Sequence, residues 1–126
     1  MRRLVLVLAL AISLMAAMTV PVGAATLHEP HQNTPALKCV TGEIGLWHFV
    51  ANQTEQTSQA FIKVTWSDNS MFMGGADRWN RGTQHWFVRG PLGLMTAQSF
   101  TDGGKTVDLP GKLVLSSAEC VKKTKS

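Results

Sequence analysis

The sequence predicts an all-β protein: a single antiparallel β-sandwich of seven or eight short strands closed by one disulfide. From Lys38 onward, β-branched and aromatic runs recur at intervals of roughly ten residues, separated by clusters of Gly, Asp, Asn and Pro. No amphipathic helical pattern of useful length interrupts them. Two cysteines, Cys39 and Cys120, bracket almost all of these runs. A small barrel fits the same pattern, and periodicity does not separate it from a sandwich.

The first 24 residues are expected to be a secretory signal peptide. Arg2 and Arg3 precede an apolar run, and small residues then provide a cleavage site after Ala24 or Ala25. The run is shorter than the ~20 residues that a membrane-spanning helix needs, and no later run is comparable. The sequence therefore predicts a secreted or extracytoplasmic protein with no transmembrane segment once the signal is removed.

Residues 25–36 are polar, broken by proline and without periodicity, so we expect a flexible leader ahead of a β-sandwich domain at 37–120. A basic tail follows at 121–126. The chain has 12 Lys and Arg against 8 Asp and Glu, a net charge of +4. Because Arg2, Arg3 and three lysines of the tail supply this excess, the domain itself is close to neutral. A near-neutral domain argues against a nucleic-acid-binding protein.

Eight segments have the composition of strands. Alternation in the third of them places Ala60, Ile62, Val64 and Trp66 on the face toward the core. The expected strands are residues 37–40, 46–51, 60–66, 70–73, 83–89, 94–100, 105–109 and 112–116.

The segment 46–51 is apolar on both faces apart from His48, which suits a central strand. In 83–89 neither face is cleanly apolar, so its orientation stays open. Residues 67–69 and 101–104 are turn formers, because Asn and Gly accept positive φ and Asp bonds its own backbone. We expect a hairpin at each.

An even pair of cysteines in an exported chain is expected to be bridged. Closing a loop as long as that between Cys39 and Cys120 would stabilise the domain by roughly 4–5 kcal/mol in the chain-entropy model. A reactive or metal-binding thiol would need a Cys-x-x-Cys partner or a setting that lowers its pKa, and the sequence shows neither.

Five short motifs occur in order along the chain. They are Cys39, Trp-His-Phe-Val at 47–50, Ile-x-Val-x-Trp at 62–66, His-Trp at 85–86 and Leu-Ser-Ser-x-x-Cys at 115–120. This pattern resembles an uncharacterised module of predicted bacterial secreted and surface proteins. The resemblance implies a β-sandwich and an extracytoplasmic location. It says nothing about activity, because the module has no assigned function. Residues 71–80 depart from the polar hairpin that is usual in that module.

The best candidate recognition loop contains Arg78, Trp79, Asn80 and Arg81. A Trp in a polar segment can stack on a sugar ring or an aromatic partner, and an Arg pair can bind carboxylate or phosphate. We therefore expect a non-enzymatic binding module that acts through its end loops on a glycan, an anionic envelope polymer or a protein, without a cofactor. The alternative is that Trp79 caps the open end of the sandwich while both arginines are solvated.

A secreted metal-binding protein is the alternative function. His48 and His85 each lie beside a Trp, and Glu43, Asp77 or Glu119 could add a third ligand. The two histidines lack the close spacing of metal motifs, so each could equally make a hydrogen bond across a sheet.

A second metal site depends on where the signal is cut. After cleavage at Ala25 the chain begins Thr26-Leu27-His28, whose amine, two amide nitrogens and imidazole can surround Cu(II) or Ni(II) in a plane. Cleavage at Ala24 removes that site. The sequence contains neither the paired carboxylates nor the nucleophile motif that would indicate an enzyme.

Overall fold

The computed structural model describes residues 26–123, so the expected signal peptide lies outside the described residues. Within this range the chain forms seven strands and one short 3₁₀ turn, η2 (Glu29–His31). The strands are β1 (Glu43–Asn52), β2 (Phe61–Trp66), β3 (Met71–Gly75), β4 (Arg78–Asn80), β5 (Thr83–Gly90), β6 (Leu94–Phe100) and β7 (Lys112–Lys122).

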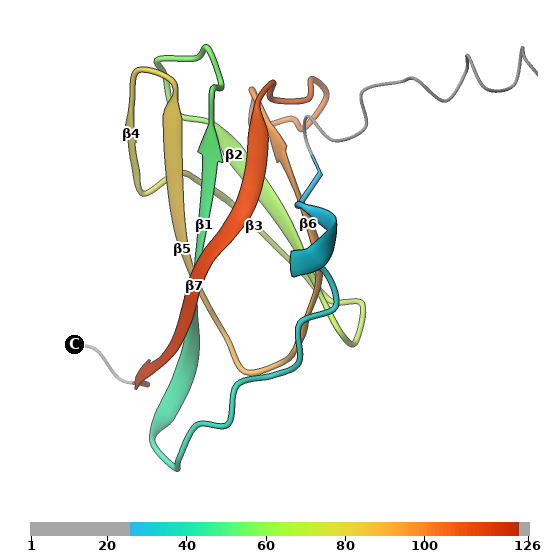
Figure 1. The fold of residues 1–126 in the computed structure, drawn as a ribbon, viewed down its shortest axis with the longest axis vertical. Helices are drawn as coiled ribbons and strands as arrows, with labels where there is room; N and C mark the ends of the chain where they lie inside the picture. Colours follow the sequence, from blue (N-terminus) through green and yellow to red (C-terminus); the bar gives the residue numbers. More distant parts are fainter. Residues whose placement is uncertain (1–25, 124–126) are drawn as a thin grey trace, which may run out of the picture.

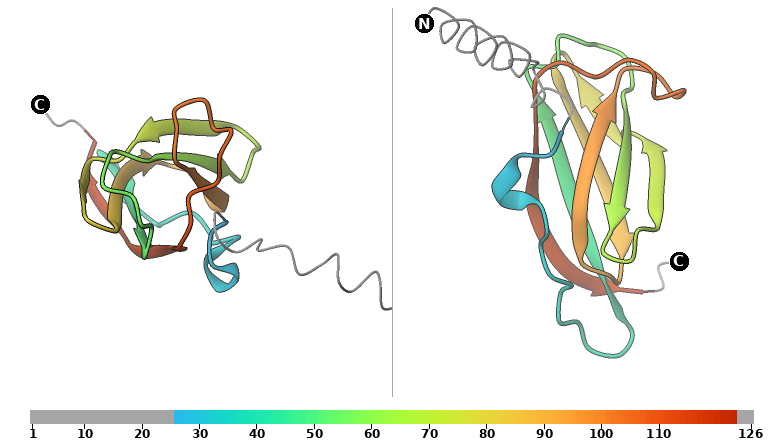
Figure 2. Two further views of the ribbon diagram at one scale, coloured as in Figure 1. Left: turned by 90° about the horizontal axis from the view of Figure 1, so that it is seen from above. Right: turned by 90° about the vertical axis from the view of Figure 1, so that its right-hand side faces the viewer.

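The strands make two antiparallel sheets, ordered β4-β5-β1-β7 and β3-β2-β6. Figures 1 and 2 show the two layers with the long strand β1 inside the larger sheet. One cluster of buried side chains draws on both sheets: Trp47 and Trp86 come from the first, Ile62 and Trp66 from the second. The rings of Trp47 and Trp66 meet edge to face with centroids 5.9 Å apart. The expected all-β antiparallel fold is confirmed.

Alternation correctly predicted the buried face of β2, because Ala60, Ile62, Val64 and Trp66 are all 7% exposed or less. The expected central strand is also confirmed, since β1 pairs with both β5 and β7. In β5 the structure decides the open orientation: Gln84, Trp86 and Val88 are buried.

Two expected strands are wrong. Residues 37–40 form no strand, and Val40 is 67% exposed. Residues 105–109 make a single bridge, between Asp108 and Phe100, so the turn at 101–104 opens a loop instead of a hairpin. The Asp102 carboxylate causes this: it accepts the N–H groups of Thr106 and Val107, which a strand ladder would need.

β7 continues six residues beyond the expected 112–116, ending at Lys122. The register with β1 shifts between His48 and Phe49, so β7 carries an extra residue there. Such a shift exchanges the two faces of a strand, and a strict alternation stops at that point.

The described part of the expected flexible leader is ordered, so that expectation is wrong from Thr26 onward. Leu27 is 1% exposed, and its N–H donates to the Ala97 carbonyl of β6 at 2.8 Å. The His28 N–H donates to the Leu113 carbonyl of β7 at 2.9 Å. This segment, seen beside β6 in Figure 1, therefore joins the two sheets along one side. The sequence did not predict this order, because a single buried leucine among polar residues produces no periodic pattern.

The disulfide between Cys39 and Cys120 is confirmed, with Cα atoms 5.6 Å apart. It ties the loop ahead of β1 to the last part of β7. Within residues 26–123, no helix has the length and apolar character required to cross a membrane.

Candidate functional site

The outer side of the four-stranded sheet carries the side chains best suited to bind a ligand or a metal. Because Trp47 and Phe49 point into the core, His48 between them points outward. The register places Phe87 of β5 opposite His48, and it places Arg78 of β4 opposite His85. We call the surface formed by His48, Arg78, His85 and Phe87 the histidine face.

Three rings of the histidine face lie in contact and nearly parallel to one another. The His48 ring lies 4.3 Å from the Phe87 ring at 12°, and 5.2 Å from the His85 ring at 19°, measured between centroids. Nε2 of His48 and Nδ1 of His85 share a hydrogen bond of 3.0 Å. The Arg78 guanidinium lies 5.9 Å from the Phe87 centroid, within reach of a cation–π contact. The result is a cluster of three rings with a cation beside it.

The charge state of this surface depends on His48. Partial burial lowers the pKa of His48, and the nearby positive charges of His85 and Arg78 lower it further. The ring therefore stays neutral to a lower pH than an ordinary histidine. A neutral imidazole can share one proton with its neighbour, whereas two imidazolium rings cannot form that hydrogen bond.

The expected recognition loop is in part an edge strand. Arg78, Trp79 and Asn80 form β4, and Arg81 follows in the turn to β5. Asp77 anchors this edge, because its carboxylate accepts the Phe87 N–H at 2.8 Å. All four predicted residues are exposed, but they divide between two sides of the strand.

Arg78 and Asn80 share the histidine face, opposite His85 and Thr83. Trp79 lies opposite Gln84, whose side chain points inward, so Trp79 belongs to the other side of β4 and is 42% exposed there.

The structure brings His48 and His85 together but leaves the expected third ligands elsewhere. Within residues 26–123, the one group of three ligand types at coordinating distance is Cys39, Glu43 and Cys120, and both sulfurs are in the disulfide. The Asp77 carboxylate is held by the backbone of β5.

The N-terminal copper site meets a structural obstacle. It needs the amide nitrogens of Leu27 and His28, and both N–H groups are hydrogen-bonded to the sheets. His28 itself is exposed, with its ring 5.1 Å from that of His31. Metal binding there would require the first described residues to leave the fold.

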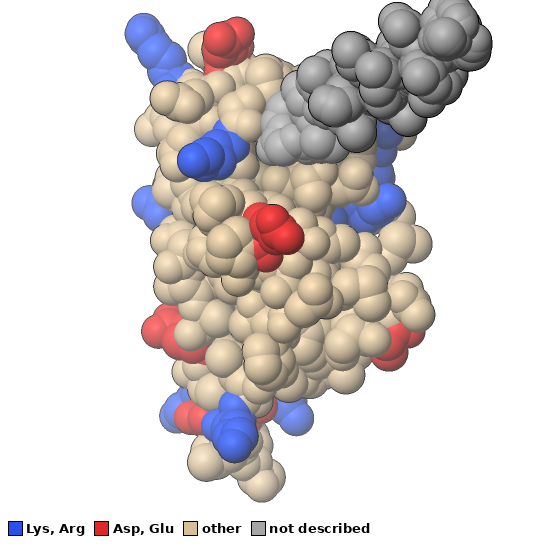
Figure 3. Space-filling model, turned by 45° about the vertical axis from the view of Figure 1, so that its right-hand side comes forward, with Lys and Arg blue, Asp and Glu red and all other residues tan. Residues whose placement is uncertain are grey.

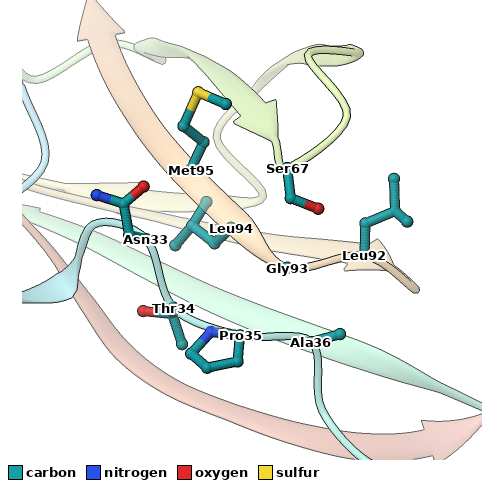
Figure 4. A pocket seen from close by; sticks show the side chains of 9 residues that line it. All are labelled: Asn33, Thr34, Pro35, Ala36, Ser67, Leu92, Gly93, Leu94 and Met95. Carbon is teal, nitrogen blue, oxygen red and sulfur yellow. The ribbon is translucent and has the colours of Figure 1, made fainter.

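A pocket of about 450 Å³ lies where the N-terminal segment crosses the start of β6 (Figure 4). Two of its backbone N–H groups are already paired: that of Leu94 donates to the Thr34 carbonyl and that of Ser67 donates to the Gly93 carbonyl. The pocket is mainly apolar and open. Sequence reasoning missed it because one wall belongs to the expected leader. Its lining residues are Asn33, Thr34, Pro35, Ala36, Ser67, Leu92, Gly93, Leu94 and Met95.

Comparison with protein families, curated proteins and solved structures finds no match to this chain.

Proposed function

We propose that this protein is an exported, non-enzymatic binding module whose ligand lies on the histidine face and the adjoining β4–β5 turn. One observation carries the proposal: His85, His48 and Phe87 form a cluster of nearly parallel rings at the surface, with Arg78 beside them. An aromatic ring with a free face can bind the flat side of a sugar or aromatic group, and a guanidinium binds a carboxylate or phosphate.

This combination supports an anionic polymer with ring-shaped units, such as an acidic envelope glycan, over a neutral one. Asn80 and Arg81 continue the polar edge toward the end of the sheet, where a long ligand could extend. On the face shown in Figure 3, Lys and Arg do not gather into one field.

Binding to a defined acidic polysaccharide tests the proposal. We would titrate the disulfide-bonded protein with polygalacturonate, and with neutral dextran as a comparison, by calorimetry at physiological salt. Arg78→Ala and Phe87→Ala should each weaken binding by about tenfold or more, because each removes a charge-assisted or stacking contact. The control is Lys63→Ala, which removes a cation from the outer side of the other sheet. Equal binding by wild type and Arg78→Ala, or equal affinity for dextran, contradicts the proposal.

The export part of the proposal rests on the expected signal peptide and agrees with a protein that carries a disulfide. Intact mass of protein recovered from the export compartment tests it. The expected mass corresponds to a chain starting at Ala25 or Thr26 and lies two hydrogens below that of the reduced form. A chain that retains residues 1–24 contradicts export by cleavage.

A metal function is the second candidate, favoured by the 3.0 Å separation of the His48 and His85 nitrogens. Two nitrogens that bind one ion at ~2.0–2.1 Å lie about 3 Å apart, so the pair could chelate Zn(II) or Cu(II) with small rotations. Titration with each metal, on wild type and His48→Ala, tests this against His28→Ala as control. Unchanged affinity in His48→Ala excludes the histidine face as the metal site.

A further inference from the structure

The two sheets have four edge strands, and the chain itself covers two of them. Thr26 and Thr34 bridge to β6, and Leu27 bridges to β7. The third edge, β4, is only three residues long and carries Arg78. The fourth edge is β3, and among the described residues it pairs with β2 alone.

β3 lacks the features by which proteins protect an open edge. Its sequence, Met-Phe-Met-Gly-Gly, contains no charge and no proline, and its pairing with β2 contains no bulge. Met71, Phe72 and Met73 are 55%, 39% and 51% exposed. Trp79 on the neighbouring edge β4 adds a further 42% exposed aromatic ring. Apolar side chains along the open edge of a sheet are typical of an interaction surface.

We infer that β3 pairs with β3 of a second copy of this chain, antiparallel and centred on Met73. In this register Phe72 of each copy faces Gly74 of the other, and Met71 faces Gly75. Glycine opposite an aromatic ring leaves room for that ring to cover the exposed backbone. Phe72 already covers Gly74 of its own strand, where an added Cβ would lie 2.9 Å from the ring. Two rings thus share the space above two glycines.

The match of β3 to its own sequence favours a second copy over another extended partner, because each large side chain at 71–72 faces a glycine of the other copy. No like charges face each other within the strand, because β3 contains no charged residue. The pairing would merge the two three-stranded sheets into one six-stranded sheet, β6-β2-β3-β3-β2-β6. This inference does not rest on the proposed function, because the histidine face stays free.

Solution mass tests the inference on the mature, disulfide-bonded chain. Light scattering after size exclusion at micromolar concentration should give twice the chain mass. Met73→Asp places two carboxylates opposite each other and should give a monomer with unchanged circular dichroism, because the side chain is half exposed. Val107→Asp is the matched control: Val107 is 54% exposed in a loop outside β3, and its variant should remain a dimer.

A cross-link tests the register. Residues facing each other in an antiparallel pair have Cα atoms ~4.5–5.5 Å apart, within disulfide range. Met73→Cys should therefore form a covalent dimer under mild oxidation, whereas Val107→Cys should not. A monomeric wild type, a Met73→Asp dimer, or equal cross-linking of both cysteine variants overturns the inference. So does a monomer that binds an added extended peptide along β3.

Discussion

His48 links the histidine face to the stability of the whole fold. Its pKa is lower in the folded chain than in the unfolded chain, where it lies near ~6.5. The unfolded state therefore binds more protons between the two values, and stability falls as the pH drops from about 6.5 through the folded pKa. Above this window the contribution is fully present.

We expect the urea midpoint to hold steady above about pH 7 and to decrease toward pH 5. The urea midpoint of His48→Gln should decrease less over the same range, because this variant lacks the imidazole that the fold keeps neutral. His28→Gln, which removes an exposed ring, serves as the control and should follow wild type. A decrease in His48→Gln as large as that of wild type would show that another group is responsible.

Two buried tryptophans differ in a single hydrogen bond. Nε1 of Trp47 donates to the Gly90 carbonyl at 3.2 Å, whereas Nε1 of Trp86 has no partner among the described residues. Both side chains are 1% exposed or less. Changing either to Phe removes a similar volume, so the comparison isolates the hydrogen bond.

Trp47→Phe should therefore destabilise the protein by about 1–2 kcal/mol more than Trp86→Phe, because it removes a buried hydrogen bond that Trp86 does not make. Chemical denaturation of the two variants, with m-values compared, measures the difference. Equal losses would mean that the Gly90 contact adds nothing beyond packing.

At the level of elements, the junction between the 101–110 loop and β7 depends on Gly111. Its φ is +104°, and an added Cβ would meet the Asn52 carbonyl at the end of β1. Gly82 also has a positive φ, +81°, but its Cβ would meet nothing within 4 Å. These two glycines separate backbone strain from a steric clash.

Gly82→Ala should cost about 1–2 kcal/mol through the left-handed conformation alone. Gly111→Ala adds the clash and should cost clearly more, shifting the start of β7 away from β1. Thermal and chemical denaturation of both variants provide the measurement. Similar losses in the two would show that the Asn52 contact relaxes without cost.

How far the sequence predicted each element depends on whether the element carries an alternating pattern. β6 was expected at 94–100 and lies there, and the inward face of β2 was correct. β4 escaped detection because Arg78, Trp79 and Asn80 are exposed on both sides, as edge positions often are. His48 and His85 were named from sequence, but their contact depends on a strand register across 37 residues, which no local pattern shows.

At the level of the whole molecule, the disulfide is the main covalent constraint. It closes a loop of 81 residues and holds the end of β7 against the entry to β1. The double variant Cys39→Ser, Cys120→Ser should lose about 2–5 kcal/mol, mostly because its unfolded chain regains freedom. Denaturation of wild type with and without reductant gives the matched comparison. An unchanged midpoint would mean that strain in the folded state cancels the entropic gain.

The strand order also determines when folding can finish. β1 lies between β5 and β7, and Leu27 and His28 form hydrogen bonds to β6 and β7. When a chain is synthesised from its N-terminus, these hydrogen bonds of Leu27 and His28 therefore cannot all form until β7 has emerged. Until residue 122 has emerged, the inward side of β1, with Trp47 and Phe49, has only part of its cover. The domain therefore reaches its folded form only when the whole chain as far as β7 is free to fold.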